Sequence, residues 1–254
     1  MSALEGRKVM GSGASSGTGR ALAIGLARRG ADVAFMSRRR DELDAAVAEA
    51  GSGHVVTLDV ADAADVARAV EEAAEALGGT VDALIYTAGM SPLRTIEATT
   101  AEDWAKVFAV NTFGPNLVVA AALPHLTDTA VVIAFSSDSA AEPRHSLVPY
   151  AASKRALEAT LEGWRTESPG GRRFVTVVLG PTGPSSFADG FDPAAFAAVR
   201  PHWAAQGMKG GLLEADHVAE TLIAQLDVFL AHPGHGVETL LIRAPVPAPT
   251  DPAG

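Results

Sequence analysis

Short apolar runs alternate with longer, alanine-rich amphipathic stretches along most of the chain. The short runs have the length of strands, and the longer stretches have the apolar spacing of helices. We expect strands at Lys8–Ser12, Asp32–Ser37, His54–Leu58, Ala83–Tyr86, Ala130–Phe135, Phe174–Leu179 and Glu238–Ile242. We expect helices at Gly17–Arg29, Asp41–Ala50, Asp62–Leu77, Thr100–Leu123, Tyr150–Glu167 and Glu214–Ala231. Asp62 is a candidate N-cap, and Gly114-Pro115 predicts a break in the fourth helix.

Strands that alternate with helices form βαβ units, in which a parallel sheet is covered on both faces. The pattern continues without a linker from Lys8 to Ile242, so we expect one α/β domain, residues 1–243. The segment 180–211 interrupts the pattern and is rich in glycine, proline and phenylalanine, so we expect a long loop that serves as a substrate lid. Residues 244–254 are mostly proline and alanine and are expected to form a flexible tail.

Composition and charge narrow the function classes. The net charge is −10, which disfavours nucleic acid as a partner. The chain has no cysteine, which removes disulfides, thiolate nucleophiles and cysteine-ligated metals and fits a cytoplasmic protein. The histidines are scattered, so we expect no metal site. No apolar run reaches the length of a membrane span and the start lacks an apolar signal region, so we expect neither a membrane partner nor export.

A glycine-rich turn follows the first expected strand. Gly13, Gly17 and Gly19 have the spacing Gly-x-x-x-Gly-x-Gly, between that strand and the first helix. Glycine lets backbone N–H groups approach a pyrophosphate without a Cβ clash, at a helix N-terminus that favours negative charge. A glycine-rich turn alone is a weak signal, but this position favours a dinucleotide site.

The end of the second strand indicates which dinucleotide. Ser37 and Arg38 stand where an acidic residue would hold the ribose 2′-hydroxyl of NAD, and the first acid comes at Asp41. A guanidinium binds phosphate through two parallel hydrogen bonds. The sequence therefore predicts NADP(H), with Arg38 near the 2′-phosphate and Arg40 as a solvated residue that opens a helix.

A tyrosine and a lysine lie four residues apart at the start of the fifth expected helix. Tyr150 and Lys154 share one helix face, and Ser137 precedes the tyrosine by thirteen residues. The cation lowers the cost of forming a phenolate, so we expect the pKa of Tyr150 to fall. Tyr150 is thus a candidate general acid or base, and Ser137 a candidate donor to a carbonyl or alcohol oxygen.

In this order and spacing, the motifs resemble the short-chain dehydrogenase/reductase family in its classical form, over about Leu4 to Ile242. The resemblance implies a doubly wound, Rossmann-type parallel sheet of about seven strands with helices on both faces. It implies that Asp59 contacts the adenine, and that Thr87 and Thr182 replace the family's usual asparagine and glycine. The implied NADP(H) contacts are Gly13, Ser15, Ser16, Gly17, Thr18, Gly19, Ser37, Arg38, Arg39, Asp59, Val60, Ala88, Gly89, Tyr150, Lys154, Pro181 and Thr182.

The resemblance also implies a catalytic set of Asn111, Ser137, Tyr150 and Lys154. The implied chemistry is hydride transfer between C4 of a nicotinamide and a carbon that bears oxygen. Tyr150 would donate a proton in reduction, and Ser137 would hydrogen-bond the reacting oxygen. Lys154 would lower the pKa of the tyrosine and bind the nicotinamide ribose, while Asn111 would hold a water.

The substrate class and the partners are expectations of the same kind. The lid carries Phe187, Phe191, Phe196 and Trp203, which favours a small apolar substrate, although a loop packed on itself has the same composition. Family members usually form dimers or tetramers through helices that match Thr100–Leu123 and Tyr150–Glu167. We therefore expect a homodimer or homotetramer, with close helix approach at the alanine-rich faces Ala120-Ala121-Ala122 and Ala151-Ala152.

Two alternatives stay open. The same fold could serve non-redox chemistry, such as elimination, epimerisation or cyclisation, or it could serve cofactor sensing without turnover. Lys154 and the three glycines argue against a halide-expelling relative, which normally has arginine in place of the lysine. A pure sensor has no need of an intact set of asparagine, serine, tyrosine and lysine.

Overall fold

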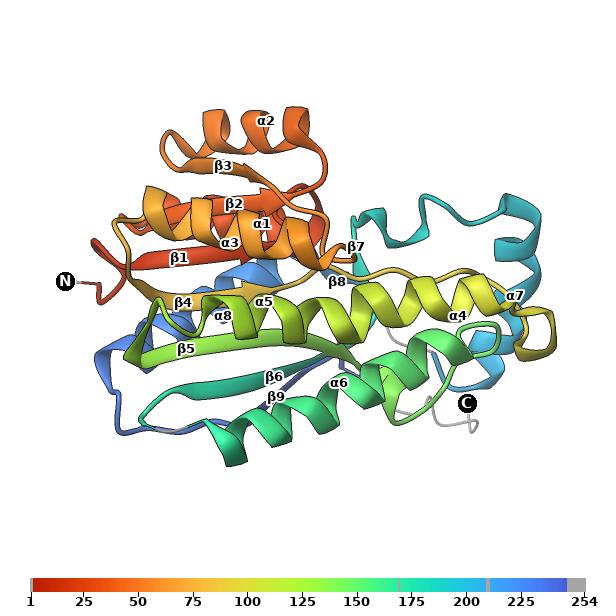
Figure 1. Cartoon of the computed structure of the whole chain (residues 1–254). Coiled ribbons are helices and arrows are strands. Elements are labelled where there is room, and N and C mark those ends of the chain that lie inside the picture. The colour runs from red at the N-terminus through yellow and green to blue at the C-terminus, as the bar shows by residue number, and fades with distance from the viewer. Residues whose placement is uncertain (1, 169, 209–210, 246–254) are drawn as a thin grey trace.

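The computed structural model describes residues 2–168, 170–208 and 211–245. Seven parallel strands form one sheet in the order β3-β2-β1-β4-β5-β6-β9 (Figure 1). The strands are β1 (Lys8–Ser12), β2 (Asp32–Ser37), β3 (His54–Thr57), β4 (Val81–Tyr86), β5 (Leu126–Ser137), β6 (Arg173–Leu179) and β9 (Thr239–Ile242). The order reverses between β1 and β4, so the sheet is doubly wound, as the family resemblance implied.

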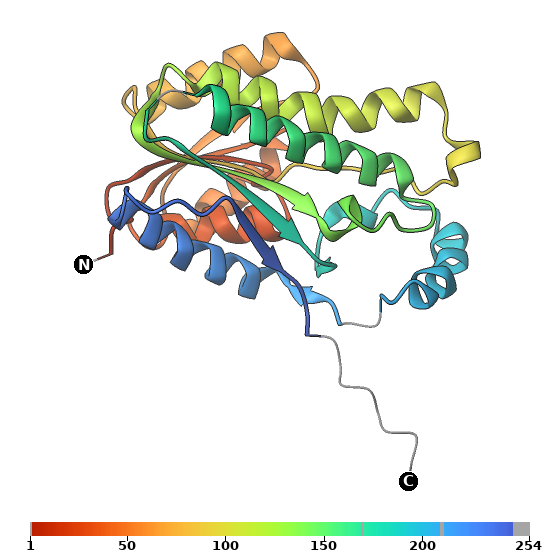
Figure 2. The same cartoon turned by 90° about the horizontal axis from the view of Figure 1, so that it is seen from below.

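Helices cover both faces of the sheet, as Figure 2 shows. One face carries α1 (Gly17–Ala27), α2 (Arg40–Ala50) and α8 (Ala215–Ala231). The other carries α3 (Ala63–Ala76), α5 (Gly114–Ala122) and α6 (Val148–Glu167). The helix α4 (Ala101–Phe108) precedes α5 and packs against α6. Each layer buries its own apolar cluster against the sheet, and this burial is the main stabilising term of the fold.

The central strands are buried on both faces, which is why they appear in the sequence as continuous apolar runs. Both β1 and β2 have the predicted bounds, and the other strands and helices differ from expectation mainly at their ends. The expected cap of α3 is confirmed, because the Asp62 carboxylate accepts hydrogen bonds from the backbone N–H groups of Ala64 and Asp65.

The helix from Ala101 to Ala122 is continuous, so the break expected at Gly114-Pro115 is wrong. The segment Ala109–Phe113 is π-helical, and the Gly114 N–H bonds to the Ala109 carbonyl five residues back. This wider turn carries the chain past Pro115, which has no N–H to donate. This helix is long and apolar enough to cross a membrane. A core helix of a globular domain can have the same length and hydropathy, so this is weak evidence for a membrane span.

The segment expected to be a long loop contains a helix, so that expectation is wrong. It forms α7 (Pro193–Ala205), flanked by two short paired strands, β7 (Thr182–Gly183) and β8 (Leu213–Glu214). The Asp192 carboxylate caps α7 at the Ala195 N–H, and Pro193 occupies its first turn. In Figure 1, α7 lies beyond the carboxyl ends of the strands. Residues 246–254 of the expected tail lie outside the described residues.

Candidate active site

A cavity of about 770 Å³ opens at the carboxyl ends of the strands, between the glycine-rich turn and the segment around α7. This is where doubly wound sheets bind ligands, and the volume suits a small molecule or cofactor. Every predicted cofactor-binding residue lines this cavity, and so do three of the predicted catalytic residues: Ser137, Tyr150 and Lys154. Asn111 does not line it and lies buried behind its wall.

The glycine-rich turn is shaped by its contact with the end of β4. A Cβ on Gly13 or Gly19 would collide with the Thr87 hydroxyl, so both positions need glycine. The Thr87 N–H and hydroxyl both donate to the Ser12 carbonyl, at 2.9 and 2.8 Å. Thr87 therefore ties β1 to β4, and its substitution for the family's asparagine leaves these central strands joined.

The arginines after β2 differ in what they contact. The Arg39 guanidinium donates to the Ser15 hydroxyl at 3.0 Å, across the mouth of the glycine-rich turn. Arg38 is exposed and lines the cavity. Arg40 pairs with Asp44 at 3.6 Å, one helical turn along α2, in keeping with the surface role expected of it. Two guanidiniums thus border the cavity where the sequence predicted a 2′-phosphate.

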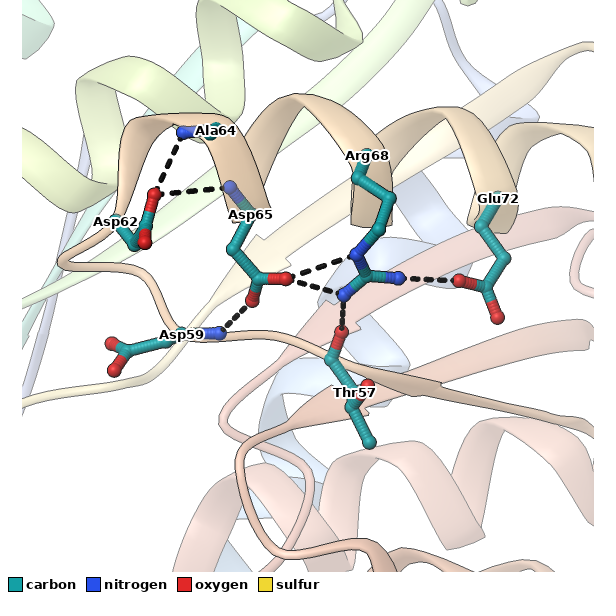
Figure 3. Close-up of polar contacts among 7 residues, drawn as sticks. All are labelled: Thr57, Asp59, Asp62, Ala64, Asp65, Arg68 and Glu72. Carbon is teal, nitrogen blue, oxygen red and sulfur yellow. Dashed lines mark hydrogen bonds and ion pairs between the residues drawn. The ribbon is translucent and has the colours of Figure 1, made fainter.

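The loop that carries Asp59 is held by a polar network (Figure 3). The Asp59 N–H donates to the Asp65 carboxylate at 2.6 Å, and Arg68 bonds both Asp65 and the Thr57 carbonyl. The backbone bond from Asp59, followed by the bond from Arg68, lowers the pKa of Asp65. Asp59 and Val60 therefore line the cavity on a loop braced from α3.

Tyr150 lies in the first turn of α6, and its ring meets Phe187 edge-on at 5.0 Å. Burial raises the pKa of Tyr150 to about 12, the Ser137 hydroxyl opposes this rise, and the Asp138 charge adds to it. This is the reverse of the lower pKa that we expected from Lys154. The Lys154 ammonium is 5.8 Å from the centre of the tyrosine ring and donates instead to the Phe135 carbonyl at 2.6 Å. Burial lowers the pKa of Lys154 to about 8, against the opposing effect of Glu158.

The Asn111 side chain bonds to neighbouring groups of the protein. Its carboxamide accepts the Met90 N–H at 2.9 Å and donates to the Met90 carbonyl and the Ser153 hydroxyl. These bonds come from the π-helical turn and fix the chain beside Gly89. Asn111 therefore lies in the predicted neighbourhood, with its side chain engaged by the cavity wall.

The aromatic residues of the α7 segment face the same cavity. Ring contacts run from Tyr150 through Phe187, Phe191 and Phe196 to Trp203, with centroids 5.0–6.0 Å apart. The cavity wall also contains Pro181 and Thr182 on the cofactor side. Among the lining residues that were not predicted from the sequence are Asp138, Arg144, Leu147 and Leu212. Of these four, Asp138 had a signal in the sequence, because it directly follows Ser137.

The chain matches the family model described as short chain dehydrogenase over residues 8–187. It is 34% identical over 242 residues to glycine betaine reductase ATRR of Emericella nidulans, which covers 88% of this chain and 19% of that protein. It is 36% identical over 161 residues to the uncharacterized oxidoreductase YhxD of Bacillus subtilis, covering 61% of this chain and 54% of the relative. The chain thus spans from about a fifth to about half the length of these relatives.

Solved structures share the fold. A dehydrogenase/reductase from Sinorhizobium meliloti has a TM-score of 0.76 at 30% identity, covering 94% of each chain. An alcohol dehydrogenase from Thermococcus sibiricus, complexed with 5-hydroxy-NADP, has a TM-score of 0.81 at 24% identity, covering 97% of this chain and 100% of that one. A Burkholderia phymatum family member in complex with NAD has a TM-score of 0.80 at 24% identity, covering 95% and 90%. The chain belongs to the short-chain dehydrogenase/reductase family of oxidoreductases.

Proposed function

We propose that this protein transfers a hydride between NADP(H) and the carbonyl or alcohol carbon of a small, apolar substrate. The observation that carries the proposal is the convergence of Ser137, Tyr150 and Lys154 on one cavity, between a glycine-rich turn and a row of aromatic rings. Such an arrangement supports acid–base chemistry at a substrate oxygen that lies between the glycine-rich turn and the aromatic rings.

The residues present fit a dinucleotide. Gly13, Gly17 and Gly19 line the cavity at the start of α1, where a helix N-terminus favours an anionic pyrophosphate. Arg38 and Arg39 favour a 2′-phosphate over a bare hydroxyl there. The bound nicotinamide would supply or accept the hydride.

The proton chemistry belongs to the chain. Tyr150 is neutral at physiological pH, so in the reductive direction its hydroxyl donates a proton to the oxygen that gains charge. Ser137 donates a hydrogen bond to the same oxygen. Lys154 would hold the nicotinamide ribose, and its charge would favour the phenolate that remains on Tyr150 after proton transfer. Asn111 keeps the wall beside Gly89 in place through Met90.

Tyr150→Phe tests this mechanism. The phenyl ring fills the same space, so the fold and NADPH binding should be kept while the proton donor is lost. We expect turnover to fall by about 10²–10⁴-fold. The measurement is NADPH oxidation against a panel of carbonyl compounds, run beside an NADPH binding titration. Because one fungal relative is named glycine betaine reductase and aromatic rings bind quaternary ammonium groups, the panel includes a quaternary ammonium aldehyde.

The panel also separates the alternatives. NADPH binding without oxidation by any member of the panel would favour the sensor or a non-redox reaction. If another reaction of the protein responds to Tyr150→Phe, the non-redox function becomes the better account. A variant that keeps most of the redox activity would show that Tyr150 is not the acid.

A further inference from the structure

Asp138 is a carboxylate that the proposed mechanism does not use, although it directly follows Ser137. Its Oδ1 accepts the Ser137 hydroxyl at 3.3 Å, and its side chain is 23% exposed at the cavity. A Ser137 hydroxyl that donates to Asp138 is not free to donate to a substrate oxygen. The Asp138 charge also disfavours the phenolate form of Tyr150, in the same direction as burial does. An uncompensated Asp138 would therefore hinder both residues.

Arg144 faces this carboxylate from the chain between β5 and α6. Its Nη2 lies 3.1 Å from Asp138 Oδ2, and its side chain is only 9% exposed. Among the described residues, its buried Nε has no hydrogen-bond partner. A buried and partly unsatisfied guanidinium is costly unless a charge compensates it. The pair with Asp138 supplies that compensation.

The end of α7 holds Arg144 from the other side. Arg144 Nη1 donates to the Gln206 carbonyl at 3.2 Å, and the Gln206 side chain accepts the His145 N–H at 2.9 Å. The Trp203 indole N–H donates to the His145 carbonyl at 2.8 Å. The position of the guanidinium is thus set jointly by the loop after β5 and by the segment that carries the aromatic rings.

We propose that Arg144 is a positioning residue: it holds the Asp138 carboxylate through Oδ2 and offsets its charge beside Ser137 and Tyr150. This inference rests on the function proposed above. Other charged groups on the neighbouring elements are Glu142, whose N–H donates to the Asp138 carbonyl at 3.1 Å, and Lys154 and Glu158 on α6. Asp189 lines the same cavity, and His145, next to Arg144, stacks on His202 at 4.1 Å. The substitutions below leave these groups unchanged.

Arg144→Gln keeps a hydrogen-bond donor and removes the charge. We expect the rate of carbonyl reduction to fall by about tenfold or more, with NADPH affinity unchanged. Alcohol oxidation needs the Tyr150 phenolate, so its rate increases with pH as Tyr150 ionises; this increase is the rising limb of the pH profile. In Arg144→Gln we expect the limb to move to higher pH by about one unit, because a nearby negative charge raises a phenol pKa. The double variant Asp138→Asn/Arg144→Gln has neither charge, so its limb should return toward that of the unmodified protein.

Arg7→Gln is the matched control. It breaks an arginine–aspartate pair of similar length, Arg7 with Asp82 at 3.0 Å, at the amino-terminal edge of the sheet. It should alter neither the rate nor the limb. If Arg144→Gln slows the reaction without moving the limb, Arg144 only holds the α7 segment in place and the inference is wrong. The inference would also be wrong if the rising limb of the double variant lay at the same pH as that of Arg144→Gln.

A second measurement needs no substrate. The chain has two tyrosines, and burial raises the pKa of the other, Tyr86, well above its usual value. Ultraviolet titration of the phenolate in the NADP⁺ complex therefore follows Tyr150, with Tyr150→Phe as the baseline. The midpoint should be higher in Arg144→Gln than in the double variant. If the midpoint is higher in Arg144→Gln but the protein shows no redox turnover, the proposed function is refuted and the inference is supported. Equal midpoints in the two variants would refute the inference.

Discussion

The Lys154 ammonium is buried, and we expect this to make cofactor binding depend on pH. Burial lowers its pKa to about 8, so its charge is present below that pH and is lost as the pH rises through it. We expect the affinity for NADPH to weaken above about pH 8, as measured by fluorescence titration across pH. Lys154→Ala should bind NADPH more weakly at neutral pH and lack this dependence. If NADPH affinity fell above about pH 8 in Lys154→Ala as well as in the unmodified protein, a group other than Lys154 would cause the pH dependence.

The second prediction at the residue scale concerns the choice of cofactor. Arg38 is exposed at the cavity, where an acid would repel a 2′-phosphate. Arg38→Asp should weaken NADPH binding by about 1.5–3 kcal/mol, the contribution of a hydrogen bond to a charged group, and bring NADH close to NADPH. Arg40→Asp is the control, because Arg40 pairs with Asp44 and does not line the cavity. Equal affinity of the unmodified protein for both cofactors would contradict the assignment.

The residues of the site could be predicted where one short motif holds them together. The glycine-rich turn and the pair Tyr150 and Lys154 are of this kind, because a turn or a helix fixes their spacing. Arg144 could not be found this way, since it reaches the cavity only through its contacts with Asp138 and Gln206. The direction of the Tyr150 pKa shift was also beyond the sequence, because it depends on burial and on where the Lys154 ammonium points.

At the scale of elements, the loop after β3 depends on α3. Asp65→Ala removes the carboxylate that accepts the Asp59 N–H and binds Arg68 (Figure 3). We expect a loss of about 1–2 kcal/mol in stability and weaker NADPH binding, because the backbone that presents Asp59 to the cavity loses its brace. Glu72→Ala removes only the outer, exposed partner of Arg68 and should change little. Thermal unfolding and NADPH titration of both variants test this, and equal effects on NADPH binding would contradict it.

The elements differ in how far the sequence reveals them. The strands were predicted well because parallel strands buried on both faces need unbroken apolar runs. The helix α7 was missed, although Asp192-Pro193 is a start signal, because Pro201 and the surrounding glycines outweighed it. The π-helical turn has no sequence signature of its own and follows from how the chain accommodates Pro115.

At the scale of the whole molecule, we propose self-association through the face formed by α5 and α6. These helices lie side by side, joined by a hydrogen bond between Asn116 and Thr160 (Figure 1). The alanines expected to line the contact are not all available, because Ala122 and Ala151 are buried in the chain's own core. Two large apolar residues are exposed here instead. Phe113, in the π-helical turn before α5, is 58% exposed, and Leu117 on α5 is 37% exposed.

Phe113→Asp tests this interface. A carboxylate in the middle of an apolar contact is left desolvated and unpaired, so we expect a dimer or tetramer to dissociate by at least one step. Light scattering at micromolar concentration gives the mass of each species. Ile96→Asp is the matched control, since Ile96 is 59% exposed but lies in the 3₁₀ turn Ile96–Ala98, outside this face. A monomeric unmodified protein, or dissociation by Ile96→Asp in place of Phe113→Asp, would show that this face is not the interface.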